Sequence, residues 1–182
     1  SEVERLKDEL RKASEELKKE VEEIEKRLRE MSERSRKLVE ELKRTLKEIE
    51  KELKDIVRKD KEKKEELKRI VEEADRLVKE IEDRLRRLNE KSEEDAKEVD
   101  DRLKRKLDES RKRIKEVEKD LKGDRLKEEV ERVLREHEKS LERLRERLKE
   151  LLERHHKTNE ELLREIKEAL ERLEKIVKDL TD

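Results

Sequence analysis

The feature that most constrains this chain is a set of apolar residues that recur at one constant spacing. Val3, Val21, Val39 and Val57 stand eighteen positions apart from one another. The same step recurs later in two leucine series, namely Leu67, Leu85, Leu103 and Leu121, and Leu126, Leu144, Leu162 and Leu180. Eighteen residues make five turns of an undistorted α-helix, whereas a heptad repeat would impose a left-handed supercoil. The pattern therefore predicts long, nearly straight α-helices.

The composition agrees with helices and excludes an ordinary globular core. Of the 182 residues, 63% are charged and 28% are hydrophobic, and the chain has no Pro, Cys or aromatic residue of the Phe, Trp or Tyr type. Soluble domains are typically about 25% charged. Disordered polyampholytes reach such values, but they lack a periodic apolar pattern. Helices rich in Glu, Lys, Arg and Leu are the remaining class.

The charge pattern excludes several classes of partner. The 57 basic and 58 acidic residues are interleaved, and the net charge is −1. A nucleic-acid binder would show a basic patch or aromatic stacking residues, and a membrane protein would show an apolar run of about 18 residues. Neither is present, and the absence of cysteine removes disulfides and thiolate sites. We expect a soluble protein with no nucleic-acid, membrane or cofactor partner, in a compartment that the sequence does not specify.

The apolar series loses its phase at two places, which divide the chain into three helices. The first break is a charged stretch that contains Asp60, a residue suited to an N-cap position. The second contains Gly123 and Asp124, which suit the end of one helix and the N-cap of the next. The predicted helices span residues 2–58, 61–122 and 125–181.

These helices predict an all-α fold. Each has about 58 residues and a length of about 87 Å, and short connections make consecutive helices antiparallel neighbours. The narrow apolar stripe of each helix suffices for one three-helix core. We expect an elongated, nearly straight antiparallel three-helix bundle that forms one domain over residues 1–182 and is monomeric. If residues 89–94 and 155–159 were loops, five shorter helices would result, but the apolar series passes through both stretches in phase.

A few polar residues replace or flank apolar ones without a change of phase. When the hairpins are folded, these residues gather into two layers that are one repeat, or about 27 Å, apart. The first layer contains Ser14, Ser110, His137 and Ser140, and the second contains Ser32, Ser35, Asn89, Ser92, His155, Thr158 and Asn159.

A buried polar group that lacks a partner costs about 1–3 kcal/mol, so these residues should bond to one another. We expect His137 to pair with Ser110 and Ser140. The partners expected for His155 are Asn89, Ser92, Thr158 and Asn159. An apolar seam with this repeat tolerates slippage of one helix along another, whereas misaligned polar layers would be unsatisfied. The layers are therefore predicted to set the register of the helices.

Catalytic and metal sites are not indicated. His137 and His155 lie too far apart to share a metal ion, and the adjacent His155 and His156 point about 100° apart on a helix. A His–Ser pair would need an orienting acid, an oxyanion hole and a cleft to catalyse acyl transfer. We expect no enzymatic activity and no metal site.

The whole chain resembles computationally designed helical bundles of the parametric kind with built-in hydrogen-bond networks. The resemblance rests on the valine series, the layered Ser, Asn and His residues, the loop at Gly123 and a surface of Glu, Lys, Arg and Asp. Spectrin-type repeats are a natural analogue, but their aromatic core residues have no counterpart here. The resemblance implies a stable scaffold without evolved activity. The alternative is an interaction or switching module that exchanges a helix with a partner or a second copy, with a pH response through buried His.

Overall fold

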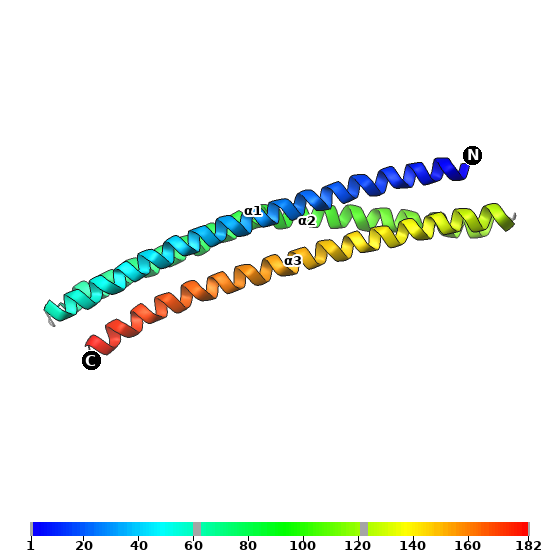
Figure 1. Ribbon diagram of the computed structural model, residues 1–182. Coiled ribbons are helices and arrows are strands. Elements are labelled where there is room, and N and C mark those ends of the chain that lie inside the picture. Colours follow the sequence, from blue (N-terminus) through cyan, green and yellow to red (C-terminus); the bar gives the residue numbers. More distant parts are fainter. Residues whose placement is uncertain (1, 60–62, 121–123, 182) are drawn as a thin grey trace. The chain divides into compact units, whose positions relative to one another are not determined.

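The computed structural model describes residues 2–59, 63–120 and 124–181, and all but Lys63 of these lie in three α-helices (Figure 1). Helix α1 spans Glu2–Lys59, α2 spans Lys64–Asp120, and α3 spans Asp124–Thr181. The prediction of an all-α, three-helix chain is confirmed. Because α2 and α3 continue through residues 89–94 and 155–159, the alternative with five shorter helices is wrong.

The ends of the helices differ slightly from the prediction. Helix α2 begins three residues later than expected, and the carbonyl oxygen of Lys63 accepts a hydrogen bond of 3.2 Å from the backbone N–H of Leu67. Lys63 thus stands at the N-cap position, and the expected cap, Asp60, lies outside the described residues, as does Gly123. Leu67 is the first core residue after this break.

Helix α3 begins one residue earlier than predicted. Asp124, expected as the N-cap, is already a helical residue. Caps and helix ends are hard to place to a single residue from sequence, because several polar residues in a row are compatible with either role.

The chain divides into two compact units, and each contains a piece of every helix. Unit 1 comprises Ser1–Leu28 and Lys91–Arg154, and unit 2 comprises Arg29–Glu90 and His155–Asp182. Within each unit the three helical pieces pack around an apolar core, so each is a three-helix bundle. The expectations that residues 1–182 form one domain and that the helices are nearly straight stay predictions.

Cross-helix pairs give the directions of the helices in unit 1. The ion pairs of α1 with α2 run antiparallel, since the residue numbers on α2 fall as those on α1 rise: Glu9–Arg113, Glu20–Arg102 and Arg27–Asp95. Pairs of α1 with α3 run parallel: Ser14–His137 and Glu25–Arg147. This is the arrangement expected when consecutive helices are antiparallel neighbours.

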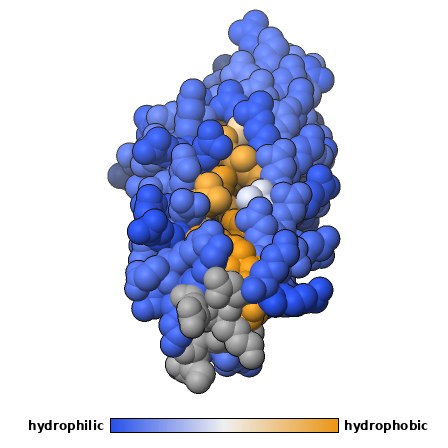
Figure 2. All heavy atoms as spheres, turned by 90° about the vertical axis from the view of Figure 1, so that its left-hand side faces the viewer, coloured by the Kyte–Doolittle hydropathy of each residue, from blue (hydrophilic) through white to orange (hydrophobic). Residues whose placement is uncertain are grey.

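The cores consist of Leu, Ile, Val and Ala side chains at the predicted seam positions. In unit 1 the largest cluster includes Val21, Leu103 and Leu141, and in unit 2 it includes Leu53 and Ile166, all fully buried. On the face drawn in Figure 2, apolar atoms lie in a narrow strip between walls of hydrophilic side chains. None of the described helices has a stretch that is long and apolar enough to cross a membrane.

The burial of the seam predicts a large difference between two leucine-to-alanine substitutions. Leu103 is 0% exposed, whereas Leu126 is 41% exposed although the apolar series places it in the seam, so the prediction that Leu126 is a core residue is wrong. We expect Leu103→Ala to lower the free energy of unfolding by about 2–5 kcal/mol, because it leaves a cavity in the core. Leu126→Ala is the matched control and should change it by less than about 1 kcal/mol. Urea unfolding followed by circular dichroism measures both, and equal effects would contradict the assignment of the core.

Candidate functional site

All eleven polar residues of the two predicted layers are at least partly shielded from solvent. Six are buried and five are half-buried, and none is exposed. The buried ones are Ser35, Asn89, Ser92, Ser110, His137 and His155, and the half-buried ones are Ser14, Ser32, Ser140, Thr158 and Asn159. Amphipathic packing explains this, because each residue lies on or beside the apolar stripe of its helix.

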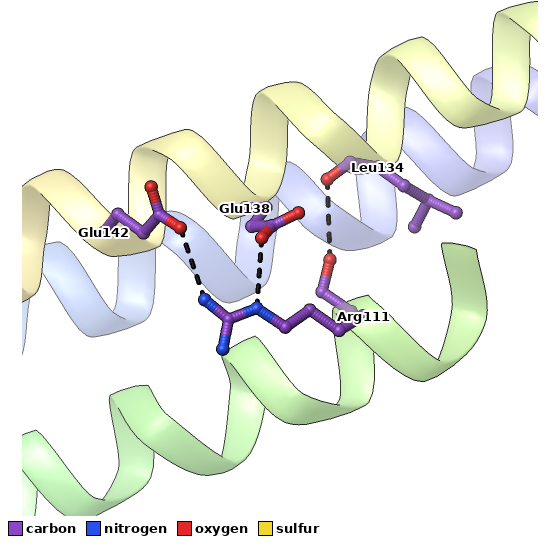
Figure 3. Close-up of polar contacts among 5 residues, drawn as sticks. Arg111, Leu134, Glu138 and Glu142 are labelled. Carbon is purple, nitrogen blue, oxygen red and sulfur yellow. Dashed lines mark hydrogen bonds and ion pairs between the residues drawn. The ribbon is translucent and has the colours of Figure 1, made fainter. Parts of the chain in front are cut away.

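In unit 1 the central contact joins α1 to α3. The Oγ atom of Ser14 lies 2.9 Å from Nδ1 of His137. Ser110 was expected to pair with His137, but its hydroxyl donates to the backbone carbonyl of Leu134 at 3.4 Å, a bond drawn as a dashed line at Leu134 in Figure 3. The serine side chain is short, and the backbone of α3 offers an acceptor within its reach. Ser14, Ser110, His137 and Ser140 are called the His137 layer below.

In unit 2 the corresponding contact is again between α1 and α3. The Oγ atom of Ser32 lies 3.2 Å from Nδ1 of His155. Asn89 was expected to bond His155, but its Nδ2 donates to the carbonyl of Leu85, four residues earlier on its own helix, at 2.7 Å. The same-helix carbonyl is a local acceptor that competes with partners on other helices. The His155 layer below consists of the unit 2 residues Ser32, Ser35, Asn89, His155, Thr158 and Asn159, while Ser92 belongs to unit 1.

The two histidine contacts are copies of one motif. Both join a serine of α1 to a histidine that stands 123 residues later on α3. They are separated by the same step as the residues of the apolar seam. The serine hydroxyl can donate to a bare Nδ1 or accept from a protonated one, so either neutral tautomer of the imidazole preserves the bond. The sequence indicated the correct serines as neighbours but not the pairing of each histidine.

The two layers differ in how completely their polar atoms are bonded. Within the described residues, four buried side-chain atoms of the His155 layer lack a hydrogen-bond partner, namely Ser35 Oγ, Asn89 Oδ1, His155 Nε2 and Asn159 Oδ1. None of the buried atoms of the His137 layer is in that situation. An unpaired buried polar group costs about 1–3 kcal/mol. The His155 layer therefore lowers the stability of its unit more than the His137 layer does.

Burial keeps both histidines neutral near pH 7. The pKa of His137 lies below the ordinary value of 6.5, first because burial disfavours the charged ring and then because Arg113 and Lys106 repel it. The pKa of His155 is lowered by burial and, to a smaller extent, by His156. An imidazole with a lowered pKa holds a proton poorly, so the neutral ring is the form that packs in each layer.

Arg111, which follows Ser110 in the sequence, forms ion pairs beside the His137 layer. Figure 3 shows Arg111 of α2 reaching two glutamates of α3, Glu138 at 3.1 Å and Glu142 at 3.4 Å. The hydrogen bond to Glu138 is the main cause of a raised pKa of Arg111. Such exposed pairs contribute little to stability, because water screens the charges. They fix side chains at the rim of the bundle but do not hold it together.

The surroundings of His137 differ from those of the histidine in a catalytic His–Ser pair. In a catalytic His–Ser pair, an acid orients the imidazole and stabilises its charged form. The charged groups that act on His137 are the cations Arg113 and Lys106, which have the opposite effect. Over residues 2–59, 63–120 and 124–181, no group of three or more His, Asp or Glu side chains is placed to hold a metal ion. The geometry is that of hydrogen bonds that join helices.

The lowered pKa values predict how stability depends on pH. Above the unfolded value of about 6.5, both states hold neutral histidines and the pH has no effect through them. As the pH falls from about 6.5 toward the folded pKa, the unfolded chain binds protons that the folded chain does not, so the free energy of unfolding decreases.

The comparison of the wild type with the His137→Asn/His155→Asn variant isolates this effect, because the carboxylates are common to both. Urea unfolding at pH 7 and at pH 5 measures it. We expect the wild type to lose more stability than the variant between the two values. Equal losses would show that the histidines do not titrate differently in the two states.

The unpaired atoms of the His155 layer predict a stabilising substitution. Asn159 is equivalent to Leu141, which stands one repeat earlier on the same helix. We expect Asn159→Leu to raise the free energy of unfolding by about 1–2 kcal/mol, because it removes a buried acceptor without a partner. The reverse change, Leu141→Asn, should lower it by at least about 2 kcal/mol, because Leu141 is 0% exposed. A destabilised Asn159→Leu variant would show that its carbonyl oxygen is satisfied in solution.

Comparisons with known proteins agree with this fold and identify no natural relative. No family model matches the chain, and no curated protein matches it. Among solved structures, the chain is similar to a computationally designed three-helix bundle, with a TM-score of 0.52 and 21% sequence identity. The match covers 98% of this chain and 80% of that one. At this identity the similarity concerns the fold alone, and it shows that the fold is that of a three-helix bundle.

Proposed function

We propose that this chain is a designed structural scaffold with no natural biochemical activity, and that its two buried polar layers set the register of its helices. The single observation that carries the proposal is the repeated Ser–His contact between α1 and α3. The similarity to a designed bundle and the lack of a matching family support the designed origin. The protein is monomeric in this proposal and requires no partner or cofactor.

The layers act most strongly against a displacement of one helix along another by one or two turns. Apolar residues recur every three or four positions along each stripe, so a slip of one or two turns still brings apolar residues together. Such a slip separates both histidines from their serines and leaves buried polar groups unpaired, at a cost of about 1–3 kcal/mol each. The correct register is then the one in which both pairs form together.

A slip by the full repeat is excluded only in part by these pairs. If α3 moved by one repeat along α1, His137 would meet Ser32 and keep a hydrogen bond of the same kind. His155 would then stand opposite Glu50 in place of Ser32. One of the two contacts is lost, and a third of the seam no longer overlaps its partner. The layers and the finite length of the helices therefore act together.

An apolar version of both pairs tests this role. The test variant carries Ser14→Ala, Ser32→Ala, His137→Leu and His155→Leu, and the control variant carries Thr45→Ala and His156→Ala at exposed positions. We expect the wild type and the control to be single species of 22.4 kDa in light scattering. The test variant should be more resistant to urea, because polar groups have left its core, but should form mixed oligomers and exchange an added α3 peptide.

Two outcomes would contradict parts of the proposal. A test variant that stays a single monomer and excludes the peptide would show that the seam and the connections alone set the register. A wild type that itself takes up the added α3 peptide, or that scatters as a dimer, would favour a module that exchanges helices.

A further inference from the structure

A groove between α1 and α2 in unit 2 has an unusual lining for a surface of alternating charges. Leu38 and Leu88, both half-buried, provide its apolar lining. The cations around it are Arg34, Lys37, Arg84 and Arg87, and the only carboxylate in the lining is Glu41. Its volume of about 560 Å³ is within the usual range of pockets for small molecules.

The four cations are available to a ligand. All of them are exposed, and within the described part of the chain none takes part in an ion pair. The nearby Asp83 is paired with Arg86 at 3.7 Å and does not line the groove. Clustered charges of one sign along a groove raise the local concentration of ions of the other sign. The groove therefore attracts anions.

The core does not account for both leucines. Leu38 packs against the apolar cluster of unit 2, so part of its surface belongs to the core. Leu88 is not among the described side chains that pack against that cluster. Its apolar surface faces the groove, where burial under a ligand would contribute roughly 25 cal/mol per Å².

The repeat itself provides a reference for this groove. In unit 1 a groove of about 350 Å³ includes in its lining the residues that stand one repeat away from Arg34, Leu38, Arg84, Arg87 and Leu88. There Glu20 replaces Leu38 and Lys106 replaces Leu88, and Glu20 forms an ion pair with Arg102. Its charged lining is balanced, with three acidic and three basic residues, namely Glu16, Glu20, Glu109, Arg102, Arg105 and Lys106. The apolar lining and the excess of positive charge in unit 2 are thus local departures from the repeat.

We propose that the unit 2 groove binds a small amphiphilic anion. Its apolar body lies on Leu38 and Leu88, and its carboxylate or sulfonate lies among Arg84, Arg87 and the cations of α1. Arginine suits this role because its planar guanidinium donates two parallel hydrogen bonds to an oxyanion. The site belongs to unit 2 and does not involve the polar layers, so it is independent of the proposed scaffold function.

Decanoate, below the concentration at which it forms micelles, is the probe of the test. Isothermal titration calorimetry gives its affinity, and the methyl resonances of labelled leucines show where it binds. We expect shifts at Leu38 and Leu88, and no shift at Leu17, which lines the groove of unit 1. The decyltrimethylammonium cation has an alkyl chain of nearly the same length and the opposite charge, and it should bind at least about tenfold more weakly.

Two double variants separate the apolar from the charged contribution. Leu38→Glu/Leu88→Lys copies the residues that unit 1 has at these positions without a change of net charge. Arg84→Glu/Arg87→Glu reverses two cations at exposed positions, so the helices are retained even if the first variant folds poorly. Each should weaken decanoate binding at least tenfold. The matched control, Arg69→Glu/Arg76→Glu, reverses two exposed cations of α2 outside the groove and should change it less than twofold.

The proposal is overturned by any of three results. Equal binding of decanoate and decyltrimethylammonium would mean that the leucines act as a nonspecific apolar surface. Unchanged affinity in Arg84→Glu/Arg87→Glu would remove the role of the cations. Equal losses in that variant and in the Arg69→Glu/Arg76→Glu control would mean that the net charge of the protein, and not this groove, governs the binding.

Discussion

The burial of one narrow apolar stripe per helix is the interaction on which the rest of this structure depends. With 63% charged residues, the chain has few other groups to remove from water. The stripe keeps the period of an undistorted helix through each of the three segments, so a helix can continue for 57 or 58 residues with the same face inward. Exposed ion pairs between helices contribute little by comparison. Every polar residue placed in the stripe therefore lowers the stability that the stripe provides.

The two histidine layers differ in how much stability the polar residues remove. In the His137 layer the buried polar atoms find partners, including a backbone carbonyl of α3. In the His155 layer the same Ser–His contact is accompanied by three residues with unpaired buried oxygens. Such groups reduce stability but penalise alternative registers even more, because any misalignment leaves further groups unpaired. The pattern is consistent with a protein whose apolar seam provides stability and whose interruptions provide uniqueness.

Departures from the repeat are also where recognition of other molecules can arise. A surface that follows the repeat has acidic and basic residues in balance. The unit 1 groove is an example, because its lining has as many acidic as basic residues. One repeat away, Leu38 and Leu88 stand in place of Glu20 and Lys106, which gives the unit 2 groove an apolar surface. Arg34 stands in place of Glu16, which contributes to its excess of cations. These three exchanges are enough to change both the polarity and the charge of the groove lining.

The sequence by itself determined the helices, their number and most of the residues of their cores. The 3.6-residue period of the apolar stripe involves only residues that are close in sequence, so it can be recognised without knowing how the helices pack. It also determined that the eleven polar residues would be shielded from solvent. Only the tertiary structure decided the partners: Ser14 rather than Ser110 for His137, and Ser32 rather than Asn89 for His155. Which hydroxyl reaches which ring depends on the axial offset between α1 and α3, and local carbonyls such as that of Leu85 compete for the same donors. The start of α2 at Lys64 was not determined by the sequence either, because several charged residues in a row are compatible with the first turn of a helix or with the residues before it.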